Sequence, residues 1–102
     1  CSRVYDMTFL DRDDVREFHL KYQDRIMLAT DICAGKPHGE LTDDNVSEWV
    51  EQTRQVYRTQ KAFYETDDEI SVEGHPGRGI ALPDDVLEKV YYINAEKWFP
   101  GL

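Results

Sequence analysis

The chain has 102 residues, of which 40% are hydrophobic and 32% are charged, a size that suits one small domain or part of a larger one. Its 21 acidic residues outnumber its 12 basic residues, which gives a formal charge of −9. This acidic balance disfavours nucleic acid and anionic membrane surfaces as partners, because both attract basic proteins. No apolar run approaches the ~18 residues of a membrane-spanning helix.

The first predicted element is a helix over 12–23, for which Asp11 provides the N-cap. Acidic residues follow in its first turn, where they suit the positive end of the helix dipole. Its apolar stripe has spacings of three and four residues and consists of Val15, Phe18 and Tyr22. His19 lies beside this stripe, and we expect it at the surface or at the boundary of the core.

A buried strand is predicted over 25–30, where the sequence reads RIMLAT. Consecutive apolar residues without polar alternation are typical of a strand that is covered on both faces, as in parallel sheets. A helix followed by such a strand is half of a βαβ unit. Because a lone parallel strand cannot satisfy its own backbone groups, we expect its neighbours to lie in a longer parent protein.

The longest predicted helix covers 43–65 and is capped by Thr42. Its apolar residues recur with a period near 3.6, and they include Val46, Trp49, Val50, Val56, Tyr57, Phe63 and Tyr64. This spacing predicts a core-facing stripe rather than an aromatic platform on which ligands stack.

A glycine-rich connector is predicted over 74–79, after an acidic cluster over 66–69. The connector lacks the Gly-Lys-Ser/Thr ending of a phosphate-binding loop, and the cluster lacks the spacing of a calcium-binding loop. A third helix is predicted over 83–98, with Pro83 near its first position. Pro100 and Gly101 end this helix.

Asp31 is the strongest candidate for a catalytic residue, because it directly follows the end of the predicted strand. Catalytic groups of (β/α)₈ barrels occupy the C-terminal ends of strands. A carboxylate at such a position can bind a divalent metal or act as a general base. The alternative is that Asp31 only caps the following loop.

His38 and Arg78 lie in predicted loops and are candidate substrate contacts. The three histidines, His19, His38 and His75, form neither a His-x-His nor a His-x-x-x-His pair, so their spacing favours roles other than metal binding. Cys33 has no visible base partner, which favours an unreactive thiol.

Two segments resemble one protein family. The sequence YQDRIMLATD over 22–31 resembles the Y-x-D-R-I-x-x-G-T-D segment of amidohydrolase-related, metal-dependent hydrolases. The sequence LPDDVLEKVYYINAE over 82–96 resembles their C-terminal segment L-P-x-x-V-L-x-K-I-Y-x-x-N-A. With FYETDD over 63–68, the resemblance covers most of the chain. Ala29 replaces the glycine that the family usually has before Thr-Asp.

The resemblance implies an α/β parent with a (β/α)₈ TIM barrel, of which residues 1–102 form the C-terminal part. It also implies that Asp31 contacts a divalent metal, expected to be zinc, or the water bound to that metal, and moves a proton. The family's other metal ligands are histidines on earlier strands, and none of them lies in this chain. Members of the family include hydrolases, decarboxylases and hydratases of small molecules.

The resemblance leaves several alternatives open. The parent is interpreted as a hydrolase, with a decarboxylase of the same superfamily as an alternative. The chain by itself is expected to be inactive and to bind no metal stably, because a catalytic zinc takes about three protein ligands. Its open strand edges and apolar helix faces predict self-association or contact with the remainder of the barrel. A second interpretation is a non-catalytic helical interaction module.

Overall fold

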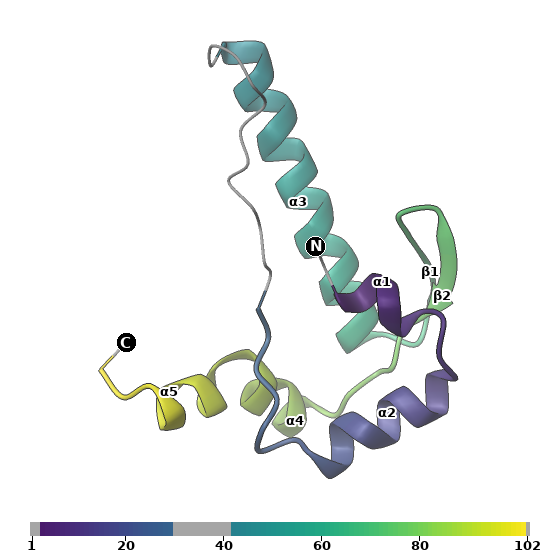
Figure 1. Cartoon of the computed structure of the whole chain (residues 1–102), viewed down its shortest axis with the longest axis vertical. Coiled ribbons are helices and arrows are strands. Elements are labelled where there is room, and N and C mark those ends of the chain that lie inside the picture. Colours follow the sequence, from purple (N-terminus) through teal and green to yellow (C-terminus); the bar gives the residue numbers. More distant parts are fainter. Residues whose placement is uncertain (1–2, 30–41, 102) are drawn as a thin grey trace.

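The computed structural model describes residues 3–29 and 42–101. Its elements, in chain order, are α1 (Arg3–Met7), α2 (Arg12–Lys21), α3 (Asp43–Glu65), β1 (Glu69–Val72), β2 (His75–Arg78), α4 (Asp84–Glu88), η1 (Lys89–Ile93) and α5 (Asn94–Trp98). Figure 1 shows that α3 extends away from the other elements, which gather around its C-terminal end. None of the helices in the described ranges combines the length and hydrophobicity that a membrane span requires.

The predicted N-cap residues, Asp11 and Thr42, stabilise the first turns of α2 and α3. The Asp11 carboxylate accepts hydrogen bonds from the backbone N–H groups of Asp13 at 2.9 Å and Asp14 at 3.1 Å. The Thr42 hydroxyl accepts one from the N–H of Asn45 at 3.2 Å. These bonds satisfy N–H groups that have no partner inside the helix. α3 has the predicted bounds, whereas α2 ends slightly before the predicted residue.

The core lies where the C-terminal end of α3 meets the segment after β2, α4 and η1. Its buried hydrophobic residues are Val4, Val15, Phe63, Tyr64, Val72, Ile80, Leu82, Val86, Leu87 and Val90. The N–H of Ile80 donates to the carbonyl of Phe63 at 2.7 Å, and that of Leu82 donates to Tyr64 at 2.8 Å. The last carbonyls of α3 therefore obtain partners from the segment that buries the end of the helix.

β1 and β2 form an antiparallel hairpin that pairs Glu69 with Arg78 and Val72 with His75. The prediction of a plain glycine-rich connector over 74–79 is wrong, because residues 75–78 form β2. The turn has positive φ angles at Glu73 (50°) and Gly74 (83°). A two-residue turn with both φ angles positive matches the twist of a hairpin, and Glu73 is not a residue that signals such a turn.

His75 attaches the hairpin to α1, a helix that was not predicted. The Thr8 hydroxyl donates to the carbonyl of Tyr5 at 2.6 Å and lies 2.9 Å from Nδ1 of His75. Because the hydroxyl has only one hydrogen, His75 donates from Nδ1 in the second bond. The ring of Phe9 lies against His75 with a centroid distance of 3.9 Å. β2 is thus held against α1 and the turn after it by one side-chain hydrogen bond to Thr8 and by ring contacts of His75 with Tyr5 and Phe9.

The strand predicted over 25–30 is wrong for its described part. Residues 23–25 form a turn, residues 26–29 belong to no sheet, and Met27 is 39% exposed. A parallel strand takes its backbone hydrogen bonds from neighbouring strands. The sheet in the described part of the chain is the β1–β2 hairpin, and it does not include residues 26–29.

Two predictions about the apolar stripes are also wrong. Along α3, Trp49 and Tyr57 are 40% and 52% exposed, because the core reaches only the C-terminal turns of this helix. In α2, Phe18 is exposed while His19 is buried. The core contacts the side of α2 that bears Val15 and His19, which are four residues apart and therefore share a face.

Candidate functional site

The two segments that resemble the hydrolase family pack against each other. η1 is a π turn, in which the N–H of Asn94 bonds to the carbonyl of Lys89. In an α-helix the same N–H would bond to Val90. The carbonyl of Val90 instead accepts a hydrogen bond of 2.9 Å from the N–H of Leu28. The π turn therefore provides the backbone acceptor that holds residues 26–29.

Asn94 strengthens this attachment from inside the structure. Its side chain is 2% exposed, and its Nδ2 donates to the carbonyls of Gln23 at 2.5 Å and Ile26 at 2.9 Å. One amide group thus uses both of its hydrogens on two backbone oxygens of the other segment.

Lys89 adds a third attachment, one helical turn before Asn94. Its Nζ donates to Oε1 of Gln23 at 2.8 Å and forms an ion pair of 3.1 Å with Asp24. The ammonium group is partly buried, which favours a persistent contact over a transient surface pair. Together, these three attachments hold residues 23–28 against η1 and Asn94.

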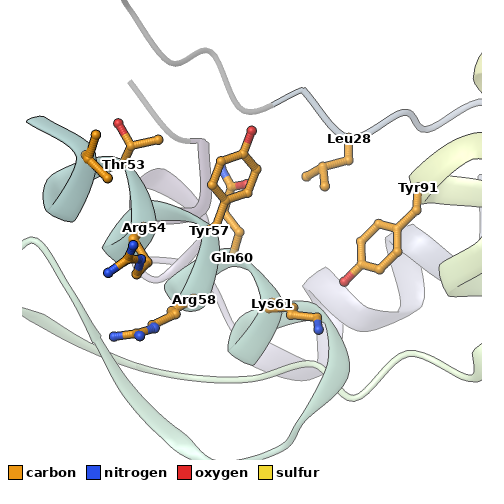
Figure 2. Close-up of a pocket in the computed structure, with 9 residues that line it drawn as sticks. Leu28, Thr53, Arg54, Tyr57, Arg58, Gln60, Lys61 and Tyr91 are labelled. Atoms are coloured by element: carbon orange, nitrogen blue, oxygen red, sulfur yellow. The ribbon is translucent and has the colours of Figure 1, made fainter.

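A groove runs beside this attachment, between α3 and the residues around Leu28 and Tyr91. Its volume is about 520 Å³, and it is lined by Leu28, Val50, Thr53, Arg54, Tyr57, Arg58, Gln60, Lys61 and Tyr91. Figure 2 shows Leu28 and Tyr91 on one side of the groove and the residues of α3 on the other. The groove combines an apolar lining with three basic side chains, in a chain whose net charge is −9.

The tyrosines near the groove keep their protons at neutral pH. Burial, together with the nearby negative charge of Glu65, raises the pKa of Tyr91 above its ordinary value of 10. Burial raises the pKa of Tyr64 to about 12. Both hydroxyls can donate hydrogen bonds, and neither is a base at neutral pH.

His19 is the buried histidine of the core. Its Nδ1 lies 2.8 Å from the carbonyl of Val15, an acceptor, so Nδ1 carries the proton. Burial lowers the pKa of His19, and the hydrogen bond to Val15 only partly opposes this effect. The ring packs edge-on against Tyr64, with 5.7 Å between the centroids. These contacts give His19 a packing role rather than access to a substrate.

The residues predicted to contact metal or substrate are not assembled into one site by the described structure. Asp31 and His38 lie outside the described residues. Arg78 lies on β2, where its Nε donates to the carbonyl of Asp67 at 2.9 Å and its Nη2 pairs with the Asp67 carboxylate at 3.0 Å. The residues that line the groove do not include Arg78.

The described residues do not fit a zinc site by themselves. Within residues 3–29 and 42–101, no three His, Cys, Asp or Glu side chains are close enough together to hold a metal ion. A catalytic zinc takes about three such ligands.

Sequence reasoning did not find the groove or the role of Asn94. The recurrence of Arg54, Arg58 and Lys61 at four and three residues could have indicated a basic edge along α3. No local pattern around Asn94 reveals that it contacts Ile26, 68 residues earlier. Comparison of the chain with protein-family models, with curated proteins and with solved structures finds no match.

Proposed function

We propose that this chain is the C-terminal part of a metal-dependent hydrolase of the amidohydrolase-related type, with Asp31 as its contribution to the metal site. The observation that supports the proposal is the packing of residues 22–29 against residues 82–96. These are the two segments in which the resemblance was found, and they are joined by the bonds of Leu28, Lys89 and Asn94. A shared structural unit gives a physical reason for both motifs to occur in one protein.

The proposed reaction uses a divalent metal, with zinc expected, that lowers the pKa of a bound water. Asp31 is assigned to accept a proton, a role that suits a carboxylate near neutral pH. The substrate class is a small carbonyl or carboxylated molecule, and decarboxylation within the same family is the alternative reaction. We expect the chain alone to lack this activity, because the resemblance places the family's histidine ligands outside this chain and a catalytic zinc takes about three protein ligands.

Metal analysis of the gene product that carries this chain tests the proposal. We expect close to one divalent metal per protein in the wild type and a clear loss in Asp31→Ala. Asp68→Ala is the matched control, because it removes an exposed carboxylate beyond the end of α3. A wild-type protein without bound metal, or equal metal content in all three proteins, would contradict the assignment.

A second candidate function is a helical interaction module. The exposed apolar side chains of α3 favour it, because a contiguous apolar surface commonly marks a contact with another protein. Val46, Trp49, Val50 and Tyr57 are each between 39% and 52% exposed. This candidate needs neither Asp31 nor a metal, so the metal analysis separates it from the hydrolase proposal.

A further inference from the structure

We propose that two copies of this chain associate through α3, with the helices antiparallel and each groove receiving the N-terminal half of the other copy's helix. The inference rests on the second candidate function, the helical interaction module. It adds that the partner of this module is a second copy of the same chain. It uses neither Asp31 nor a metal, so its failure is distinguishable from failure of the hydrolase proposal.

The apolar residues of α3 have the spacing of a helix–helix contact. Val46, Val50, Thr53 and Tyr57 follow one another at four, three and four residues, and Trp49 widens the stripe on one side. Such a repeat forms the seam between two paired helices. The rest of the described chain leaves the N-terminal part of this seam exposed, as Figure 1 shows for the free length of α3.

The charges of α3 determine the direction of pairing. From Asp43 to Glu51 every charged residue is acidic, whereas from Arg54 to Lys61 every charged residue is basic. Parallel helices would place like charges beside each other. Antiparallel helices place the acidic half of each copy against the basic half of the other, which favours this arrangement electrostatically.

The groove lies at the end of α3 where this arrangement needs it. An antiparallel pair centred on Thr53 places Val50 of the second copy near Tyr57, since the two residues lie three and four positions from Thr53 and project from the same side of α3. Tyr57 lines the groove together with Leu28 and Tyr91, and the volume of about 520 Å³ accommodates the aliphatic side chain of Val50. The two-fold symmetry of such a pair fills both grooves in the same way.

Asp43 and Lys61 are the charged pair that tests the arrangement most sharply. They are 18 residues apart, which at 3.6 residues per turn is five whole turns, so both project from the same side of α3. In an antiparallel pair, the same sides of the two helices meet. Asp43 of each copy therefore approaches Lys61 of the other. Among the described residues, no ion pair involves Lys61.

Sedimentation equilibrium of the 102-residue chain at low salt tests this proposal. We expect a dimer in the wild type, and a dissociation constant about tenfold higher in Lys61→Glu and in Asp43→Lys, because each variant places two like-charged pairs in the dimer. The double variant Asp43→Lys/Lys61→Glu restores opposite charges and is expected to return close to the wild-type constant.

Glu48→Lys is the matched control, because it makes the same charge change as Asp43→Lys on a different side of α3. Circular dichroism confirms that each variant retains its helices, since Asp43 also stabilises the first turn. A monomeric wild type at millimolar concentration would overturn the proposal. A dimer whose double variant stays as weak as the single variants would also overturn it.

Discussion

The N–H of Leu28 donates a hydrogen bond of 2.9 Å to the carbonyl of Val90, whose usual intrahelical donor bonds to Lys89 in the π turn. This bond joins two segments that are more than 60 residues apart in the sequence. The irregular helix geometry of η1 leaves this carbonyl available, because a regular α-helix would use it for its own hydrogen bond. The π turn therefore exchanges one helical bond for one tertiary bond.

Replacing Asn94 with Ala should weaken this attachment strongly. The substitution leaves the buried carbonyls of Gln23 and Ile26 without their donor, so the free energy of unfolding should fall by about 2–4 kcal/mol. Urea denaturation followed by circular dichroism measures this change. Gln52→Ala on the exposed surface of α3 is the control and should change it by less than about 0.5 kcal/mol. Equal effects of the two substitutions would contradict the buried role of Asn94.

Gly79→Ala should be among the most destabilising single substitutions of a glycine in this chain. A Cβ at Gly79 would lie 1.9 Å from the carbonyl oxygen of Thr66, so the backbone must move, at a cost of about 3 kcal/mol or more.

Gly74→Asn provides the comparison for Gly79, since a Cβ at Gly74 meets nothing within 4 Å and asparagine tolerates the positive φ of 83°. We expect that variant to lose less than about 1 kcal/mol. Thermal unfolding of both variants measures the difference, and a Gly79→Ala protein as stable as wild type would show that the chain does not pack closely at this point.

The stability of the chain should depend on pH through His19. Because burial lowers the pKa of His19 below 6.5, the unfolded state takes up a proton first as the pH falls. His19 therefore leaves the stability unchanged at pH values well above 6.5. Below it, His19 reduces the free energy of unfolding by up to about 1.4 kcal/mol per pH unit.

His19→Gln isolates this contribution, because glutamine does not titrate while carboxylates in both proteins do. Urea denaturation between pH 7.5 and 5 should give a steeper loss of stability for the wild type than for His19→Gln. Parallel pH profiles would mean that His19 takes up protons equally in the folded and unfolded states.

Arg78→Ala should have little effect on stability. Arg78 and its partner Asp67 are both more than half exposed, at 56% and 57% of their side chains, and exposed ion pairs contribute about 1 kcal/mol or less. Arg12→Ala is a useful comparison, because the partly buried Arg12 donates from Nε to the carbonyl of Gly79 at 2.9 Å.

We expect the larger loss of stability in Arg12→Ala, as measured by chemical denaturation. If Arg78 contacts substrate in a parent enzyme, Arg78→Ala should raise KM there while leaving stability unchanged. A large loss of stability in Arg78→Ala would instead assign Arg78 a structural role in the hairpin.

Local signals predicted α2 and α3, whereas α1 and the long-range contacts were not predicted from the sequence. Asp11 and Thr42 marked the starts of α2 and α3 correctly, because capping depends on neighbouring residues only. The hairpin was not predicted because its turn contains Glu73, which has a positive φ. Glutamate is not a residue type that indicates such a turn. The strand over 25–30 was predicted from hydrophobicity alone, which does not supply a neighbouring strand.

The candidate site was predictable only in part, for the same physical reason. Asp31 was found from its place after an apolar run and from the resemblance, and it lies outside the described residues. Asn94 donates hydrogen bonds to Gln23 and Ile26, which are distant in sequence. The residues around Asn94 do not indicate these contacts. The groove combines Leu28, Tyr57 and Tyr91 from three separate segments, so it exists only once the chain has folded.

Amide hydrogen exchange at Leu28 tests most directly the central claim that the two motif segments form one packed unit. We expect the N–H of Leu28 to be protected in the wild type, because it is bonded to the carbonyl of Val90. Its protection should fall markedly in Asn94→Ala, with the Gln52→Ala protein exchanging like the wild type. Exchange of the Leu28 amide in the wild type as fast as in an unfolded peptide would contradict the packing on which the proposed function rests.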